Sequence, residues 1–274
     1  MRREDRELVA QLCTARAGLS VDPEKTYLLE SRLAPVARRE GFGAIGDMLT
    51  ALRERRDDHL AWAVVEAMAH AETAFFRDKA PFDLFAQEIL PRMARLRREG
   101  PVRIWSAGCG PGQEVYSLAM IADEIRVDGE PVSVELFGSD LSERALQRAE
   151  AGLYSHFEVQ RGLPIRKLVS HFAKDGEMWA LAPRIRQMVR WRRINLVADL
   201  SLANRFDVIF CRNVLSMLVE PMQVRLLENL SRTLTPHGVL VLGADERPAG
   251  RSLQPVSGRP GVFMRPPAAR VAAA

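Results

Sequence analysis

The fold is decided by one stretch of sequence, Val102-Arg103-Ile104-Trp105-Ser106-Ala107-Gly108-Cys109-Gly110-Pro111-Gly112-Gln113-Glu114. Its first five residues have the composition of a buried strand, and helical spacing of apolar residues begins after Gln113. Glycines at 108, 110 and 112 remove side chains where the backbone must turn tightly and where a ligand can approach it. The stretch therefore predicts a strand, a nucleotide-type loop and a helix.

The spacing of these glycines narrows the class of ligand. It is G-x-G-x-G, whereas dinucleotide-binding folds use G-x-G-x-x-G to present a helix N-terminus to a pyrophosphate. The shorter spacing suits a ligand with an amino-acid moiety in place of the pyrophosphate, such as S-adenosylmethionine, and it disfavours a hydride-transferring dehydrogenase. A plain strand-to-helix turn without a ligand is the alternative that the loop alone leaves open.

An acidic residue follows the next predicted strand. Residues 132–139 have the strand pattern, and Asp140 comes 28 residues after Gly112. A carboxylate at this place can accept hydrogen bonds from both hydroxyls of an adenosine ribose. Asp140 can also belong to the N-cap region of a helix that starts near Ser142. Together with the glycine loop, ribose binding is the preferred interpretation.

Strands and helices alternate after residue 100. Strand-like runs at 102–106, 132–139, 205–211 and 239–243 alternate with helical runs at 114–125, 143–151 and 221–234. This alternation predicts a doubly wound α/β sheet in a domain of residues 100–265. Residues 266–274 are predicted to be a frayed tail.

Residues 6–98 have helical spacing throughout. Breaks at residues 18–23 and 41–43, and a proline at 81 that suits the first turn of a helix ending near Leu90, divide the region into four or five short helices. We therefore predict an all-helical N-terminal domain of residues 1–99, with the boundary at Gly100-Pro101.

The composition excludes several classes of protein. The chain has 274 residues, of which 47% are hydrophobic and 27% charged, as in soluble globular proteins, and its formal net charge of +4 is too small to indicate a nucleic-acid partner. Its three cysteines have neither the number nor the spacing of a disulfide framework or zinc site. Without a signal peptide or an apolar run of membrane-spanning length, we expect a cytoplasmic location and no membrane insertion.

Several motifs together resemble the chemotaxis receptor glutamate methyltransferases, the CheR family. The residues that carry the resemblance are Glu72-Thr73-Ala74-Phe75-Phe76-Arg77, residues 105–120 around the glycine loop, and Phe206-Asp207-Val208-Ile209-Phe210-Cys211-Arg212-Asn213-Val214, with further matches at Tyr27-Leu28-Leu29-Glu30-Ser31-Arg32-Leu33, Gly152-Leu153-Tyr154 and Asn195-Leu196. The resemblance covers nearly the whole chain. It implies a helical receptor-facing domain and a Rossmann-like S-adenosylmethionine domain with a small antiparallel β insertion over about 157–194.

The resemblance also assigns roles at the reacting end of the cofactor. Thr73 and Arg77 would face the methionine moiety and the reaction centre, with Arg77 as the catalytic residue. Glu114 would take the cofactor's α-amino group, beside the loop glycines Gly108, Gly110 and Gly112. The residue types agree, because a permanent cation can orient a carboxylate and an acid can pair with an ammonium. For Glu114, a helix-N-terminal acid favoured by the helix dipole is the alternative.

The remaining assignments concern the nucleoside end and the wall of the pocket. Asp140 would hold the ribose, Asn195 and Leu196 would flank the adenine, and Arg212 with Asn213 would close the pocket from the end of the fourth strand. The activity implied is transfer of methyl from S-adenosylmethionine to glutamate carboxylates of chemoreceptors. Its products would be S-adenosylhomocysteine and the methyl esters used in sensory adaptation.

The sequence departs from the family pattern at three places, and two of them, Ala71 and Met217, motivate an alternative function. Ala71 stands where the family has asparagine, Met217 stands where it has a tyrosine beside the reacting methyl, and Gly-His-Ser-Glu is changed to Gly243-Ala244-Asp245-Glu246. A catalytically weak regulatory module that binds the cofactor and receptors is the alternative. A nucleic-acid methyltransferase is disfavoured, because residues 211–214 lack the Asn/Asp-Pro-Pro-aromatic motif.

The partner implied by the resemblance is the helical bundle of a chemoreceptor. Arg32 and Arg39 lie seven residues apart on one predicted helix and share a face with Arg38 nearby, so a basic stripe could dock beside acidic methylation sites. A solvated helix face is the alternative. In some family members the β insertion also grips a receptor tail peptide.

Overall fold

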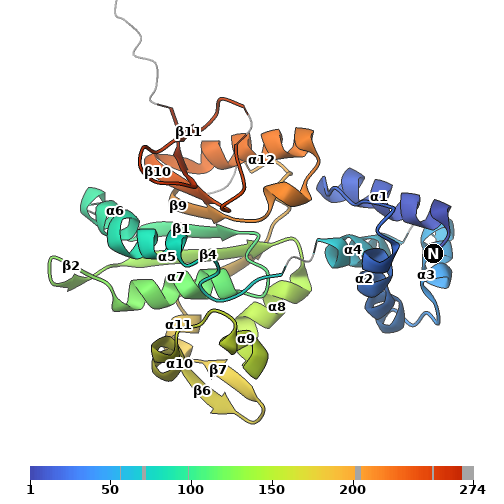
Figure 1. Ribbon diagram of the computed structural model, residues 1–274, viewed down its shortest axis with the longest axis horizontal. Coiled ribbons are helices and arrows are strands. Elements are labelled where there is room, and N and C mark those ends of the chain that lie inside the picture. Colours follow the sequence, from blue (N-terminus) through green and yellow to red (C-terminus); the bar gives the residue numbers. More distant parts are fainter. Residues whose placement is uncertain (56, 70–71, 98, 201–204, 249, 267–274) are drawn as a thin grey trace, which may run out of the picture. The chain divides into compact units, whose positions relative to one another are not determined.

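The computed structural model describes residues 1–55, 57–69, 72–97, 99–200, 205–248 and 250–266 (Figure 1). The chain folds into two compact units. The helical unit is Met1–Glu72 with Val214–Gln223, and the sheet unit is Thr73–Asn213 with Val224–Ala274. The expected tail lies almost wholly outside the described residues.

The helical unit contains the helices α1 (Arg3–Ala17), α2 (Thr26–Arg39), α3 (Ile45–Arg55) and α4 (Asp58–Met68). Their apolar stripes supply a core that includes Val9, Leu33 and Val64. The predicted breaks between helices are confirmed: Gly18 ends α1 in the left-handed conformation, and residues 40–44 separate α2 from α3.

A later segment of the chain completes this unit. The 3-10 turn η2 (Leu215–Met217) follows the sheet unit in sequence, yet the Ser20 amide donates to the Met217 carbonyl at 2.8 Å and the Val219 amide donates to the Gly18 carbonyl at 2.9 Å. A side chain at Gly18 would meet Met222 Cγ at 2.5 Å. Residues 214–223 therefore belong to the helical unit, which the sequence pattern did not indicate.

The division of the chain falls at Glu72 and Thr73 and not at Gly100-Pro101. Helix α5 (Ala80–Leu84), the π-helical segment η1 (Phe85–Ile89) and α6 (Leu90–Leu96) belong to the sheet unit. The rings of Phe82 and Phe85 lie 5.9 and 5.7 Å from that of Phe210 in the central sheet. Helical spacing predicted these helices correctly but did not indicate which core they bury.

The sheet unit is built on a sheet of order β11-β12-β10-β9-β1-β4-β8. Strands β1 (Val102–Ala107), β4 (Val134–Asp140), β8 (Val189–Arg193), β9 (Phe206–Cys211) and β10 (Leu234–Leu242) are parallel, and β12 (Val262–Met264) and β11 (Gln254–Pro255) are antiparallel. Between them run α7 (Gln113–Glu124), α8 (Glu143–Ala151) and α12 (Glu220–Thr233). The predicted doubly wound arrangement is confirmed.

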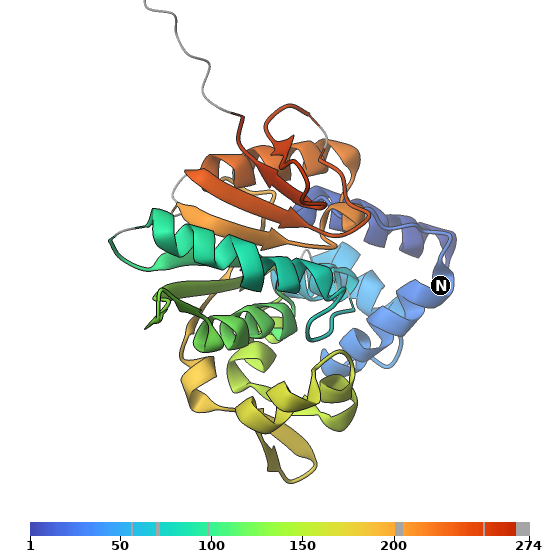
Figure 2. The same ribbon diagram turned by 60° about the vertical axis from the view of Figure 1, so that its left-hand side comes forward.

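Helices cover both faces of this sheet (Figures 1 and 2). Ile104 and Phe210 pack in one cluster with residues of α5 to α7, whereas the ring of Trp105, the neighbour of Ile104, packs on Phe206 at 5.1 Å. This alternation follows from the period of two along a strand. A strand buried on both faces reads as a nearly continuous apolar run, as the fully buried β9 does.

The antiparallel insertion begins and ends earlier than expected. Strands β5 (Leu153–Ser155), β7 (Met178–Leu181) and β6 (Phe172–Asp175) form its sheet, with α9 (His156–Gln160), α10 (Ile165–His171) and α11 (Pro183–Arg186) around them. Residues 189–193, which we assigned to the insertion, are strand β8 of the parallel sheet, paired with β4. Local spacing identifies a strand but not the neighbour with which it pairs.

Within the described residues, no helix has both the length and the apolar character needed to cross a membrane. That part of the chain also contains no group of three His, Cys, Asp or Glu side chains placed to hold a metal ion. The cysteines at 13, 109 and 211 are free and buried.

Candidate active site at the carboxyl ends of the strands

Most of the predicted site residues lie at one edge of the parallel sheet. The glycine loop follows β1, Asp140 ends β4, Asn195 follows β8, and Arg212 follows β9. The chain order reverses between β1 and β9, and ligands of doubly wound sheets bind at the carboxyl edge beside such a reversal. The topology thus brings together residues that are more than 100 positions apart.

The glycine loop has the backbone that its sequence predicts. Gly108, Gly110 and Gly112 have φ angles of 79°, 54° and 95°, a region that other residues rarely adopt. A side chain at Gly112 would also lie 2.9 Å from Ala149 Cβ and 3.1 Å from the Tyr154 hydroxyl. Gly112 is the N-cap of α7, so the loop leads directly to a helix N-terminus.

Asp140 is held against this loop. Its Oδ2 accepts from the Gly110 amide at 2.9 Å, and its Oδ1 accepts from the Ser142 amide at 2.9 Å. Ser142 is the N-cap of α8, and its hydroxyl accepts from the Ala145 amide. The Asp140 carboxylate therefore supports the start of α8 and lies beside the glycine loop, and ribose binding stays a prediction.

The centre of the site is an ion pair between Glu114 and Arg212. Nη1 of Arg212 donates to Glu114 Oε2 at 3.3 Å, and the Ser106 hydroxyl donates to Glu114 Oε1 at 2.8 Å. The side chain of Arg212 is 2% exposed and that of Glu114 is 12% exposed. Burial raises the pKa of the Glu114 carboxyl above its ordinary value, while the charge of Arg212 opposes the rise.

Arg212 also fixes the turn that carries Arg77. Its Nη2 donates to the Arg77 carbonyl at 3.0 Å and to Asp78 Oδ2 at 2.7 Å, and its guanidinium lies over the Phe82 ring at 5.5 Å. Its Nε is buried without a hydrogen-bond partner. The Arg77 side chain is 39% exposed and lies 4.0 Å from Asp78 Oδ2.

The rest of this segment is anchored in the core. Phe75 and Phe76 are buried, and the Phe76 amide donates to the Ser117 hydroxyl of α7 at 3.0 Å. Thr73 approaches the glycine loop, because its Cγ2 would lie 3.8 Å from a Cβ added at Gly110. The structure therefore brings Thr73 to the loop and ties the backbone of Arg77 to Arg212, while Ala71 lies outside the described residues.

Asn195 and Leu196 lie one strand beyond Asp140. The amide of Ile194 donates to the Asp140 carbonyl at 3.0 Å, and Asn195 Oδ1 accepts from the Val197 amide at 3.3 Å. Leu196 is buried, and its carbonyl accepts from Asn229. These contacts fix the turn after β8 at the edge of the sheet where Asp140 lies.

Glu246 is a residue of the site that sequence analysis missed. It is buried, and its Oε2 accepts from the amides of Asn213 and Gly243, each at 2.8 Å. It holds Asn213 in the left-handed conformation, with φ of 61°. The sequence did indicate a role for Glu246, because Gly243 and Glu246 are the first and last residues of the family motif Gly-His-Ser-Glu and both are retained.

Met217 lies in η2, and its predicted place beside the reacting methyl stays a prediction. Arg32 of the helical unit has other surroundings than we predicted. The Arg32 guanidinium donates to the Met68 carbonyl at 2.6 Å, and burial lowers the pKa of Arg32. Arg32 is therefore not part of an exposed basic stripe, whereas Arg38 and Arg39 are exposed. The spacing of seven placed Arg32 on the correct helix but did not account for its contact with the end of α4.

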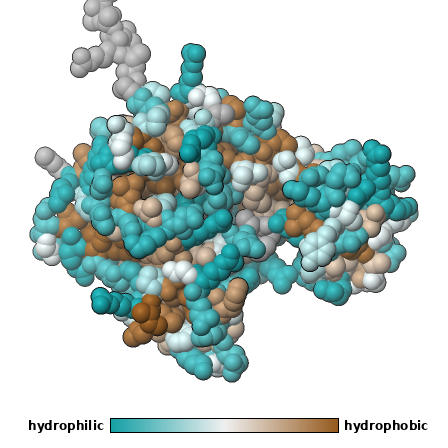
Figure 3. Space-filling view, viewed as in Figure 1, coloured by the Kyte–Doolittle hydropathy of each residue, from teal (hydrophilic) through white to brown (hydrophobic). Residues whose placement is uncertain are grey.

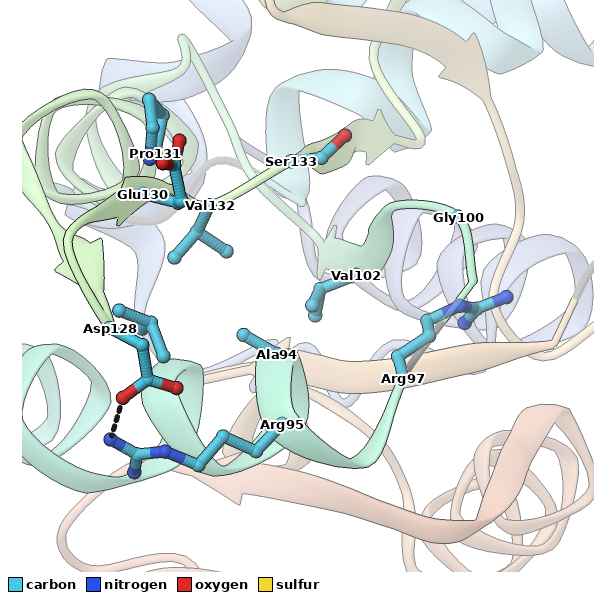
Figure 4. A pocket seen from close by; sticks show the side chains of 11 residues that line it. Ala94, Arg95, Arg97, Gly100, Val102, Asp128, Glu130, Pro131, Val132 and Ser133 are labelled. Carbon is cyan, nitrogen blue, oxygen red and sulfur yellow. Dashed lines mark hydrogen bonds and ion pairs between the residues drawn. The ribbon is translucent and has the colours of Figure 1, made fainter.

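A separate pocket of about 260 Å³ lies at the amino ends of β1 and β4 (Figure 4). It is bounded by the end of α6 and by the hairpin of β2 (Arg126–Val127) and β3 (Glu130–Pro131). Arg95 and Asp128 at its mouth form an ion pair at 3.4 Å. It lies at the opposite end of the strands from Glu114 and Arg212, and it contains none of the predicted site residues.

Comparison with known proteins supplies the family. The family model described as CheR methyltransferase, SAM binding domain, matches residues 71–254. The chain is 35% identical over 246 residues to Chemotaxis protein methyltransferase 1 of Pseudomonas aeruginosa, covering 88% of this chain and 89% of that protein. It is 35% identical over 240 residues to Chemotaxis protein methyltransferase 1 of Vibrio cholerae, covering 86% of each.

These matches confirm the predicted resemblance, the Rossmann-like fold class with preceding helices, and the predicted cofactor. They extend through both the helical unit and the sheet unit, since the relatives cover most of the chain. The chain therefore belongs to the CheR methyltransferase family and is an S-adenosylmethionine-dependent methyltransferase.

Proposed function

We propose that the protein methylates glutamate side-chain carboxylates of chemoreceptors, forming methyl esters for sensory adaptation. The observation that carries this proposal is the partly exposed Arg77 side chain, on a turn that the buried Arg212 holds through the Arg77 carbonyl. Arg212 in turn pairs with the buried Glu114. An exposed cation at this place can meet an acidic acceptor group. The names of the relatives, which are chemotaxis protein methyltransferases, support the same assignment.

The residues present fit the cofactor. A Cβ added at Gly110 would have only Thr73 Cγ2 within 4 Å, at 3.8 Å, so the loop backbone is accessible to a ligand there. Glu114 is a buried acid suited to an ammonium group. Glu114 would hold the α-amino group, with Thr73 beside the methionine moiety. Asp140 would hold the ribose, and Asn195 and Leu196 would flank the adenine.

The methyl transfer reaction does not require the protein to transfer a proton. The cofactor supplies a methyl group bonded to a positively charged sulfur. A glutamate acceptor, with an ordinary pKa of about 4.3, is already ionised near neutral pH, so no general base is needed. Arg77 would orient the acceptor carboxylate, and Arg212 with Asn213 would hold the wall of the pocket. Catalysis then rests mainly on positioning.

Affinity for S-adenosylmethionine should fall as the pH is lowered through the raised pKa of Glu114. The ionised carboxylate attracts the ammonium, and protonation removes that attraction. Because burial raises the pKa of Glu114, the loss should begin at a higher pH than for an exposed glutamate. Calorimetric Kd values between about pH 4.5 and about pH 8 check this. Glu114→Gln should bind weakly with little pH dependence, and a flat wild-type profile would contradict the assignment.

Two surfaces of the chain suit a receptor. On α2 the exposed residues Tyr27, Arg38 and Arg39 form a face that would dock on a receptor helical bundle near its acidic sites. On the insertion, β6 is an edge strand of the sort that an extended tail peptide could join. Figure 3 shows a hydrophobic patch over α10 of the insertion, where Ile165 and Val169 are 70% and 75% exposed.

The test is transfer of labelled methyl from S-adenosylmethionine to receptor-containing membranes, scored as methanol released by base. Cofactor binding is measured on the same preparation. Base-labile counts that disappear when receptor glutamates are changed to alanine would establish the ester and show that Met217 is tolerated. Tight cofactor binding without such counts would favour the alternative that Met217 motivates, a regulatory module that binds receptors.

Replacing Arg77 by alanine should reduce turnover much more than cofactor binding. We expect kcat to fall about tenfold or more while the Kd for S-adenosylmethionine stays within about twofold, because the side chain acts on the acceptor. Lys79→Ala is the matched control, since Lys79 is an exposed cation of the same segment that pairs with Asp83 at 2.5 Å. Equal losses of binding and turnover in Arg77→Ala would refute this role.

A further inference from the structure

One buried tyrosine of the insertion contacts both the glycine loop and the segment that carries Arg77. Tyr154, in β5, donates from its hydroxyl to the carbonyl of Pro111 in the glycine loop at 2.8 Å. The same hydroxyl lies against Gly112, where an added Cβ would be 3.1 Å from it. Burial raises the pKa of the Tyr154 hydroxyl well above its ordinary value, so the group keeps its proton and remains a donor.

The ring of Tyr154 packs on the segment that carries Arg77. Its centroid lies 4.9 Å from that of Phe75 in an edge-to-face arrangement, and Phe75 lies 5.6 Å from Phe172 of β6 in the same way. Such pairs contribute beyond their buried area, since the ring edge of one meets the face of the other. Phe75 is two residues from both Thr73 and Arg77, so its position fixes theirs.

The corner of the chain around Tyr154 is itself held firmly. Ser155 caps α9, and Glu158 Oε2 accepts from both the amide and the hydroxyl of Ser155 at 2.9 Å. Glu158 Oε1 also accepts from Arg148 of α8 at 2.9 Å. Tyr154 therefore extends from a braced corner and has little freedom to follow movements of the loop.

We propose that Tyr154 is a positioning residue for methyl transfer. Its hydroxyl holds the glycine loop in the shape that receives the cofactor, and its ring holds the Thr73–Arg77 turn beside that loop. Tyr154 thereby sets the distance between the glycine loop, which would receive the cofactor, and Arg77, which would contact the acceptor carboxylate. The effect on turnover rests on the proposed function, whereas the effect on cofactor binding does not involve the acceptor.

Tyr154→Phe tests the role of the hydroxyl. The ring remains, but the buried Pro111 carbonyl loses its donor, and we expect the Kd for S-adenosylhomocysteine to rise about fivefold. The matched control is Tyr116→Phe, because the Tyr116 hydroxyl is also buried and donates to a backbone carbonyl, that of Ala149 in α8, at 2.8 Å. We expect a similar loss of stability in both variants, with an unchanged Kd in the control. Binding by calorimetry and unfolding by denaturant give the two values.

Equal Kd values for Tyr154→Phe and the wild type, or the same increase in Tyr116→Phe, would overturn the proposal. The role of the ring is tested with Tyr154→Leu, which should lower kcat about tenfold below that of Tyr154→Phe. In the double variant Tyr154→Leu/Arg77→Ala, kcat should fall little below that of Arg77→Ala alone, because the ring acts through the Arg77 turn. Fully additive losses would refute the role of the ring. Failure of the proposed function would appear differently: the Kd for S-adenosylhomocysteine would still rise in Tyr154→Phe and stay unchanged in Tyr116→Phe, while the wild type itself formed no methyl ester.

Discussion

Replacing Arg212 by methionine should lower the rate of methyl transfer by about 100-fold and the free energy of unfolding by about 3–5 kcal/mol. The guanidinium is buried and serves Glu114, Asp78 and the Arg77 carbonyl at once. Without it the buried Glu114 carboxylate has lost its cation, and its pKa should rise further. The Arg77 turn also loses two of its contacts. Radiolabelled methyl transfer and denaturant unfolding measure the two effects.

A lysine variant shows whether the geometry of Arg212 or only its positive charge matters, and an exposed arginine serves as the control for stability. Arg212→Lys keeps a charge but cannot reach Glu114 and Asp78 with separate nitrogens, so most of the loss in rate should remain. Arg95→Met removes an exposed arginine paired with Asp128 and should cost less than about 1 kcal/mol. Near-normal methyl transfer by Arg212→Met would refute the central place of this residue.

Gly162→Ala should lower the free energy of unfolding by about 3 kcal/mol. Gly162 has a φ angle of 90°, and a Cβ there would lie 2.2 Å from the carbonyl oxygen of Phe75. Backbone atoms cannot give way as a flexible side chain does, so the insertion and the Phe75 segment must separate. Methyl transfer should fall as well, because Phe75 positions Thr73 and Arg77. Denaturant unfolding and the methyl transfer assay measure these losses.

The matched control for this substitution is Gly176→Ala. Gly176 has a φ angle of 57° in the same insertion, with no atom within 4 Å of an added Cβ. The Gly176→Ala variant should therefore lose only the conformational energy of a left-handed alanine, about 1 kcal/mol, because its Cβ collides with no other atom. Equal stability losses in the two variants would show that the close approach of Phe75 contributes nothing.

Most strands and helices of the parallel sheet could be predicted closely from sequence, although β10, expected over 239–243, begins at Leu234. The glycine loop, α7 and α8 were predicted to within one or two residues, because each follows from local properties: backbone freedom at glycine, apolar spacing, and a capping serine at 142. Strand β8 was placed in the insertion instead. Its short amphipathic pattern does not reveal that its partner is β4, about 50 residues earlier in the chain.

The candidate site was predicted residue by residue from family motifs, yet several of its contacts were not. Glu246 was treated as part of an altered motif, and the structure shows it holding Asn213 and Gly243. Tyr154 was noted as a motif residue without a role, and Arg32 was assigned to a surface it does not join. In each case a partner that sequence analysis lacked lies at least 30 residues away: Asn213 for Glu246, Pro111 for Tyr154 and Met68 for Arg32.

The sequence alone predicted the fold class and a nucleotide-type loop, because glycine spacing and apolar periodicity are local properties of the chain, and its motifs indicated the family. The tertiary structure decided where the units divide, which core each helix buries and which charges meet. These depend on contacts between distant segments, such as Arg212 with Glu114 and Asp78. Their energies come from burial and from geometry in three dimensions, which spacing along the chain does not specify.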